Sequence, residues 1–257
     1  MLSALKRTEP SAAAPQRRPS VRESRAERER TAGGVQLTTW DLSQLTLWSR
    51  TGYPRPDDVR QGEVGDCVYL ATLAALAYVD PASLENRIKP LPNGRYKVRL
   101  DRTVEVGPLV HARPACPTGL YADGRTSSWV ALMEKALAKR KSPLLGAPSY
   151  EALDGCKKVS TALKLLGYGI ECEGDAGDEP LEGALDEAMS GLDQRRVVIA
   201  GLDMGEEEDQ HAFAVLGYDA DTIRLYDPHG RHETLSHDEF SERVRCLCVS
   251  GELSSRK

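Results

Sequence analysis

The feature that most constrains the fold is a cysteine placed directly in front of a long apolar run, in the stretch QGEVGDCVYLATLAALA at residues 61–77. Apolar residues follow Cys67 at helical spacing and Gly65 precedes it, which predicts a buried helix that begins at the cysteine. The first N–H groups of a helix have no partner within it and carry partial positive charge, so they favour a thiolate and can bind an oxyanion. The sequence therefore predicts a nucleophile at Cys67, because a cysteine that only packs gains nothing from this position.

The size and charge of the chain narrow the classes of function. Its 257 residues are enough for one large domain or two small ones. A net charge of -5, with both signs scattered along the chain, argues against a protein that grips the phosphate backbone of nucleic acid. We therefore expect no nucleic-acid partner.

The cysteines and the apolar runs indicate the surroundings in which the chain works. Its six cysteines lie at irregular spacings without a CxxC pair, which predicts neither a zinc site nor a redox pair. The sequence shows no signal peptide and no apolar stretch of about 18 residues, so we expect no membrane span. We expect a soluble chain with reduced thiols, cytoplasmic by default or exported by a specialised route.

The N-terminal segment, residues 1–36, differs in composition from the rest of the chain. It is rich in Ala, Pro, Ser, Arg and Glu and has almost no large apolar side chains. Such a segment cannot bury enough surface to offset the entropy of ordering it. We predict a disordered basic tail or linker, which tethers the domain or binds a partner.

The remaining sequence carries mainly helix signals first and strand signals later. Apart from a strand at GRYKVRL, the first part shows helical patterns after Cys67, in SSWVALMEKALAKRK with Ser127 or Ser128 as a cap, and in VSTALKLLGYGI. A further helix, LEGALDEAMSGL, is expected to be closed by glycine like the one before it, and strands follow in RRVVIAGL, HAFAVLGYD and TIRLYDPHG. We predict an α+β fold with a helix-rich lobe at residues 37–170, a strand-rich lobe at residues 171–257 and the active-site cleft between them.

A nucleophilic cysteine needs a base, and His211 stands at the entrance to an apolar strand. If residues 211–217 and 221–227 pair as a hairpin around a loop at residues 218–220, His211 lies opposite Asp227, give or take about one residue. Asp227 then fixes the imidazole tautomer and stabilises the imidazolium while the other ring nitrogen faces Cys67. Taken singly, the histidine and the aspartate read as ordinary strand-edge and turn residues, so the hypothesis depends on all three together.

Four blocks of the sequence, in the same order, resemble the protease core of the calpain family of papain-fold cysteine peptidases. The blocks are DDVRQGEVGDCVYLATLAALA, WVALMEKALAKRKSPLLGAPSYEAL, QHAFAVLGY and IRLYDPHG, and the similarity covers roughly residues 37 to 250. The distance along the chain between Cys67 and His211 is also typical of papain-type enzymes. The resemblance implies a papain-like fold in which the helical lobe carries the cysteine and the β-rich lobe carries the histidine.

The resemblance also implies roles for individual residues. By position, Cys67 is the nucleophile, His211 the general base and acid, and Gln61 a side-chain donor to the oxyanion. Asp227 stands where the family usually has Asn. It keeps an oxygen acceptor for the His211 N–H and adds a negative charge, which stabilises the imidazolium more strongly.

Three positions depart from the family pattern near the expected site. Val68 and His229 replace two tryptophans that usually wall the site, and Gln210 replaces the glycine before the histidine. The resemblance therefore implies that substrate approaches this chain differently.

Calcium is the metal that the resemblance brings into question, because calpain cores carry calcium sites in their loops. Asp58 and Glu233 fall near positions that can ligate the ion, but Ser127 and Ser128 stand where an acidic ligand is expected before Trp129. The sequence therefore does not predict a calcium switch.

The leading hypothesis is a calpain-like thiol endopeptidase, a hydrolase that cleaves peptide bonds through a Cys-His-Asp triad and an acyl-enzyme intermediate. This reaction takes a protein or peptide substrate and requires no cofactor. Two alternatives stay open: a cysteine acyl transferase or deamidase acting on glutamine side chains, and a catalytically degenerate peptidase domain used for binding.

Overall fold

The computed structural model describes residues 38–49, 52–62, 64–112, 127–142, 152–153, 158–205 and 210–253. The tail predicted at residues 1–36 lies outside these ranges, as do Cys116 and Cys156. Within them, no helix is long and apolar enough to cross a membrane.

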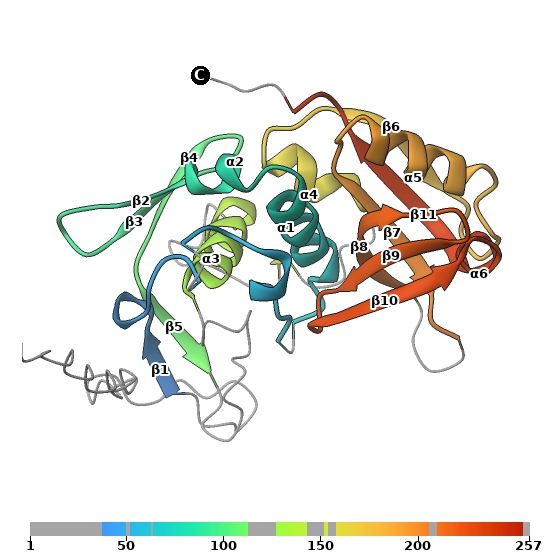
Figure 1. Cartoon of the computed structure of the whole chain (residues 1–257). Helices are drawn as coiled ribbons and strands as arrows, with labels where there is room; N and C mark the ends of the chain where they lie inside the picture. The colour runs from blue at the N-terminus through green and yellow to red at the C-terminus, as the bar shows by residue number, and fades with distance from the viewer. Residues whose placement is uncertain are drawn as a thin grey trace, which may run out of the picture.

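A six-stranded antiparallel sheet forms the C-terminal part of the structure (Figure 1). Its strand order is β10-β9-β8-β7-β11-β6, so β6 and β10 are the edges. The strands are β6 (Ile170–Asp175), β7 (Val198–Asp203), β8 (Gln210–Tyr218), β9 (Thr222–Asp227), β10 (Arg231–Ser236) and β11 (Val244–Ser250). The strands predicted in RRVVIAGL, HAFAVLGYD and TIRLYDPHG are confirmed as β7, β8 and β9.

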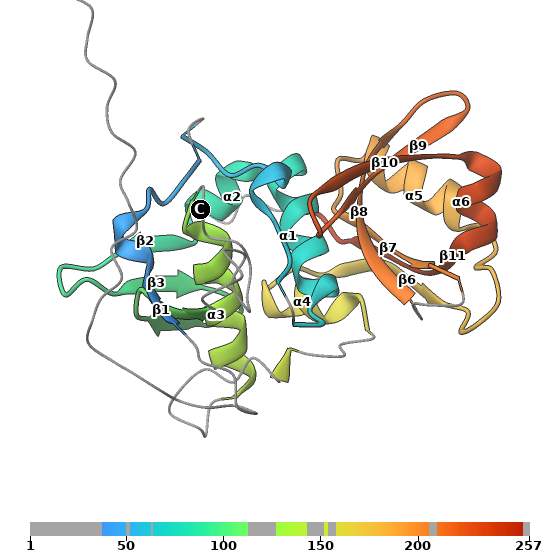
Figure 2. The same cartoon turned by 90° about the horizontal axis from the view of Figure 1, so that it is seen from below.

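The N-terminal part combines helices with two small sheets, as Figures 1 and 2 show. Its helices are α1 (Cys67–Val79), α2 (Pro81–Glu85), α3 (Trp129–Lys141) and α4 (Ser160–Leu165), with short 3-10 turns η1 (Leu42–Gln44) and η2 (Pro56–Asp58). One small sheet pairs β1 (Thr38–Asp41) with β5 (Leu109–Ala112), and the other contains β2 (Ile88–Pro90), β3 (Tyr96–Arg99) and β4 (Thr103–Val106). The predicted α+β class is confirmed, whereas the exact lobe boundaries remain a prediction.

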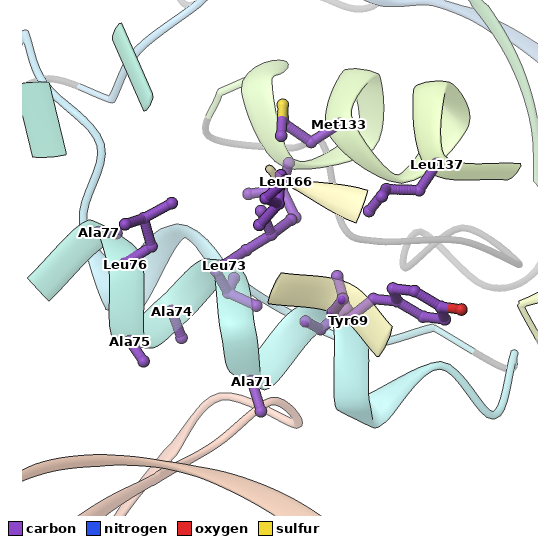
Figure 3. Close-up of a cluster of buried hydrophobic side chains, with 14 of the residues drawn as sticks. Tyr69, Ala71, Leu73, Ala74, Ala75, Leu76, Ala77, Met133, Leu137 and Leu166 are labelled. Atoms are coloured by element: carbon purple, nitrogen blue, oxygen red, sulfur yellow. The ribbon is translucent and has the colours of Figure 1, made fainter. Parts of the chain in front are cut away.

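Helix α1 lies between α3 and the large sheet and is apolar on all sides (Figures 1 and 2). All residues from 68 to 77 are buried, which explains why the sequence shows a continuous apolar run rather than a stripe. In Figure 3, Leu73 points toward Met133 and Leu166, while Ala71 points the opposite way, toward the strands. The small alanine side chains therefore allow the helix to approach the sheet closely.

The two faces of the large sheet are covered by different helices. The α1 side has a core that includes Ala212, Ala214 and Tyr226 from the sheet. The other side packs against α5 (Ala184–Asp193) and α6 (His237–Arg243) through a second core that contains Phe213 and Phe240. Burial on both faces fixes the strand register, since a slip of one residue would turn every side chain to the wrong face.

Two details of the predicted helix ends are wrong. Ser128 occupies the N-cap position of α3, but its side chain bonds to the carbonyl of Thr46 instead of capping the helix. Helix α5 is not closed by glycine, because Gly191 lies inside it against Val198 and Val249. The prediction for α4 is correct, since Gly167 follows the helix with a φ of 79°.

Candidate active site

Cys67 is the first residue of α1, as predicted. Its side chain is half-buried and packs at the border of the core on the α1 side of the sheet. The backbone N–H groups of a first helical turn have no partners within the helix, so Cys67 sits where a developing negative charge is stabilised. Because the helix behind it is buried from residue 68 to residue 77, the position of the sulfur is fixed by the core.

The other described cysteines lie in the large sheet and are poor nucleophiles. Burial raises the pKa of Cys246 to about 11 and that of Cys248 to about 12. Burial, with the charges of Glu187 and Glu171, also raises the pKa of Cys172. These thiols stay protonated near neutral pH.

His211 and Asp227 form a buried pair at the end of the large sheet. The distance between His211 Nε2 and Asp227 Oδ1 is 2.8 Å, and the two residues are only 8% and 4% exposed. An ionised carboxylate can only accept hydrogen bonds, so Nε2 carries the proton and donates it. The remaining ring nitrogen, Nδ1, is then free to face a nucleophile.

The register that brings this pair together differs from the predicted one. Ala214 lies opposite Tyr226. An irregularity between Val215 and Gly217 changes the register by one residue, so that Gly217 lies opposite Arg224. His211 and Asp227 are therefore diagonal neighbours and not direct partners. Diagonal positions share a face of the sheet, and side chains as long as these still reach across it.

Cys67 is the second side chain, after Asp227, that acts on the imidazole of His211. Burial by itself lowers the pKa of His211, but hydrogen bonds to Asp227 and Cys67 outweigh it and raise the pKa to about 9. Burial likewise opposes ionisation of Asp227, yet the hydrogen bonds from His211 and His229 bring its pKa well below the ordinary value. The arrangement favours a protonated imidazole held between a carboxylate and a sulfur atom.

His229 makes a second histidine contact with the same carboxylate. Its backbone N–H donates to Asp227 Oδ1 at 2.8 Å and its Nδ1 lies 3.0 Å from that oxygen. The rings of His229 and His211 are stacked, with centroids 4.8 Å apart and planes 17° from parallel. The sequence signalled His229 only as an unusual wall residue and gave no indication of its contact with Asp227.

The cluster of His211, Asp227 and His229 does not have the geometry of a metal site, although its ligand atoms lie within 4.8 Å of one another. A metal binds imidazole in the plane of the ring at about 2.0–2.1 Å. Two nearly parallel stacked rings cannot both direct a nitrogen lone pair at one ion. The three residues instead form a hydrogen-bonded group.

Asp58, one of the two residues near possible calcium positions, has other hydrogen-bond partners in the described structure. Asp58 is buried, and its Oδ2 accepts hydrogen bonds from the Arg55 N–H at 2.9 Å and from Trp129 Nε1 at 3.0 Å. This carboxylate therefore supports the η2 turn and α3. In the ranges that the structure describes, Glu233 and Asp58 belong to no group of three or more closely spaced ligands.

Gln61 lies beside the site, but its amide is partly occupied. Its Nε2 donates to the carbonyl of Val64 at 2.7 Å, which leaves one of the two amide N–H groups for another acceptor. Its backbone N–H donates to the carbonyl of Pro228 at 2.7 Å, one residue after Asp227. The role of Gln61 as oxyanion donor remains a prediction.

A second hydrogen bond joins the segment before Cys67 to the strand that ends in Asp227. The hydroxyl of Tyr226 donates to the carbonyl of Val59 at 2.7 Å, and both residues are buried. Sequence patterns gave no sign of this contact, because tyrosine in an apolar strand looks like any core residue. Together with the bond from Gln61 to Pro228, it holds the approach to Cys67 against the end of β9.

Val68 and Gln210, the two other departures from the expected pattern, take no part in the hydrogen bonds of this group. Val68 is buried in α1. Gln210 is exposed at the start of β8 and donates from Nε2 to the carbonyl of Gly177 at 3.1 Å. Neither side chain has a hydrogen bond to Cys67, His211 or Asp227 among the described contacts.

Comparison with known proteins gives a consistent result. A family model described as calpain family cysteine protease matches residues 41–234. The calpain-type cysteine protease DEK1 of Arabidopsis thaliana is 34% identical over 137 residues, which are 50% of this chain. The match spans only 6% of the length of that relative. The matched family region contains all four residues of the predicted site.

Proposed function

Because the chain belongs to the calpain family of cysteine proteases, we propose that it is a thiol endopeptidase whose catalytic residues are Cys67, His211 and Asp227. The observation that carries the proposal is the imidazole of His211, which has Asp227 on Nε2 and is also acted on by the Cys67 side chain. This is the arrangement that a cysteine nucleophile requires: a base within reach and a third group that orients the base.

In the proposed reaction, the Cys67 thiol first transfers its proton to His211. The resulting thiolate then attacks the carbonyl carbon of a peptide bond. The negative charge that develops on the carbonyl oxygen lies at the N-terminus of α1, where backbone N–H groups stabilise it. The free N–H of the Gln61 amide is a second donor for this oxygen.

Collapse of the tetrahedral intermediate breaks the C–N bond, and His211 gives its proton to the leaving amine. His211 then takes a proton from water, which attacks the thioester and releases the acid while the proton returns to the Cys67 sulfur. Asp227 remains ionised throughout and stabilises the imidazolium. The residues of the chain are sufficient for this cycle.

The experiment is to compare wild type with Cys67→Ala and with Cys172→Ala on a denatured protein substrate. Cys172 is a half-buried cysteine on β6 and serves as the matched control. We expect Cys67→Ala to lose turnover with an unchanged circular dichroism spectrum, and Cys172→Ala to retain it. Cleavage by Cys67→Ala at the wild-type rate would remove Cys67 from the mechanism.

Mass spectrometry of the products separates the peptidase from the two alternatives. A broken backbone indicates hydrolysis, a gain of about one dalton at glutamine indicates deamidation, and a new crosslink indicates acyl transfer. A thiol-directed peptide electrophile tests the binding-module alternative. The absence of a selective adduct at Cys67 under reducing conditions would favour that alternative.

A further inference from the structure

Asp227 has an unusual hydrogen-bond environment, because one of its oxygens, Oδ1, accepts three hydrogen bonds. One comes from His211 Nε2 and two come from His229, through its backbone N–H and its Nδ1. Since the carboxylate is ionised, each of these nitrogens must carry the proton it shares with Oδ1. His229 Nδ1 is therefore a donor, and the tautomer of this ring is fixed.

The three residues differ in exposure, and the more exposed His229 lies next to the buried pair of Asp227 and His211. Asp227 is 4% exposed and His211 8%, whereas the side chain of His229 is 43% exposed. The stacked ring of His229 lies against that of His211. A buried carboxylate needs donors to offset the loss of water, and His229 supplies two of the three on Oδ1.

We propose that His229 is a positioning residue, which holds Asp227 Oδ1 with two N–H donors and thereby sets how strongly this carboxylate holds the proton of His211. The inference rests on the proposed function and extends it to the regulation of the catalytic imidazole. A donor that shares the oxygen withdraws part of its negative charge, so less remains to stabilise the imidazolium of His211.

The sign of the effect follows from this sharing. Removing the His229 Nδ1–H leaves more negative charge on Oδ1 for His211, which raises the pKa of His211. Replacing Asp227 by Asn removes the charge and lowers the pKa of His211. If His229 acts through this charge, its removal has little effect once Asp227 is Asn.

Other charged and titratable groups also lie near the His211–Asp227 pair, and they must be the same in every variant that is compared. Cys67 on α1 also acts on the charge of His211. The side chain of Arg60, from the segment before α1, lies against Gly230 next to His229. Neither residue is changed in the variants below, so their influence is the same in every comparison.

The experiment measures the titration midpoint of the His211 ring by NMR in protein labelled at the histidine ring carbons. The variants are His229→Phe and His229→Ala, which lack the Nδ1–H, His229→Asn, whose amide can replace that donor, Asp227→Asn and the double variant Asp227→Asn/His229→Phe. His232→Phe is the matched control, because His232 lies on β10 and bonds to Asp57.

We expect His229→Phe and His229→Ala to raise the His211 midpoint by roughly half to one pH unit, and His229→Asn to return it toward wild type. Asp227→Asn should lower the midpoint, and the double variant should match Asp227→Asn. His232→Phe should leave it unchanged. An unmoved or lowered midpoint in both His229→Phe and His229→Ala, or an equal rise in the Asp227→Asn background, would overturn the proposal.

The NMR readout keeps this proposal separate from the proposed function. If no variant cleaves peptides but the midpoints move as expected, the peptidase assignment fails and the role of His229 stands. If peptides are cleaved but the midpoints do not move, the peptidase assignment stands and the proposed role of His229 fails. For an active enzyme, the alkaline limb of kcat/KM should move with the midpoint, which a change in stability alone would not produce.

Discussion

The Tyr226 hydroxyl and the Val59 carbonyl are joined by a buried hydrogen bond of 2.7 Å between residues that are far apart in the sequence. Val59 belongs to the segment that leads to Cys67, and Tyr226 immediately precedes Asp227. Burial raises the pKa of Tyr226, so its hydroxyl stays protonated and remains a donor. This hydrogen bond thus holds the segment that leads to Cys67 against the strand that ends in Asp227.

The first prediction concerns this bond. Tyr226→Phe removes only the hydroxyl and leaves a buried carbonyl unsatisfied, so we expect the free energy of unfolding to fall by about 1–3 kcal/mol. Urea denaturation measures this change. Tyr78→Phe is the control, because Tyr78 is 48% exposed, and it should change the stability by less than about 0.5 kcal/mol. Equal effects of the two substitutions would contradict a structural role for the bond.

A second prediction links the pH dependence of stability to His211. Its pKa rises from an ordinary value of 6.5 to about 9 on folding, so the protonated ring stabilises the folded state. This stabilisation is fully present below pH 6.5 and is lost as the pH rises to about 9. Relative to His211→Gln, wild type should therefore lose on the order of 2 kcal/mol of unfolding free energy across this range. Urea denaturation at several pH values checks it, and a constant difference would disagree with it.

The packing of α1 leads to a third prediction. Leu73 is fully buried and points toward Met133 and Leu166 (Figure 3). We expect Leu73→Ala to lower the free energy of unfolding by about 2–5 kcal/mol, because it leaves a cavity between helices. Leu109→Ala is the control, since Leu109 is 40% exposed. Thermal unfolding of both variants should show a much smaller loss of stability for Leu109→Ala than for Leu73→Ala. A similar loss at both positions would mean that α1 is not a central packing element.

A fourth prediction concerns the close contact between β7 and β11. A Cβ atom added to Gly201 would lie 2.3 Å from Cys246 Sγ, so we expect Gly201→Ala to destabilise the protein by about 1–3 kcal/mol. The Cys246 Cβ is 3.9 Å from the same point. Cys246→Ala should therefore recover much of the loss in the double variant.

Gly107→Ala is the control for this contact, because the nearest atom to its added Cβ, Arg95 Nη1, is 3.9 Å away. Chemical denaturation of wild type, Gly201→Ala, Cys246→Ala, the double variant and Gly107→Ala gives the comparison. If the changes in unfolding free energy of Gly201→Ala and Cys246→Ala simply add in the double variant, the predicted clash with Cys246 Sγ is not the cause of the destabilisation.

The fold and part of the site could be predicted because local patterns specify them. The continuous apolar run after Cys67 identified a buried helix, and alternating or apolar runs identified β7, β8 and β9. The pairing of His211 with Asp227 was inferred from an approximate register. It survived an error in that register because two long side chains on one face of a sheet still reach each other diagonally.

The remaining features depend on contacts between distant parts of the chain, which one sequence does not specify. The irregularity between Val215 and Gly217 leaves no local signal, and neither does the bond between Tyr226 and Val59. The contact of His229 with Asp227 was missed for a different reason. Asp227 is the last residue of β9, so the alternation of side chains along a strand does not say where His229 points, and it is the turn after Asp227 that directs both the backbone and the ring of His229 back to the carboxylate.

The burial of α1 from residue 68 to residue 77 also affects how the site responds to fluctuations. A helix covered on every side exchanges its amide hydrogens only when a large part of the structure opens, whereas exposed loops open locally at little cost. Cys67 begins this helix, and residues 68 to 77, which follow it, are all buried. The sulfur is therefore anchored to one of the slowest-opening parts of the molecule, so that fraying of the surrounding loops leaves its position largely unchanged.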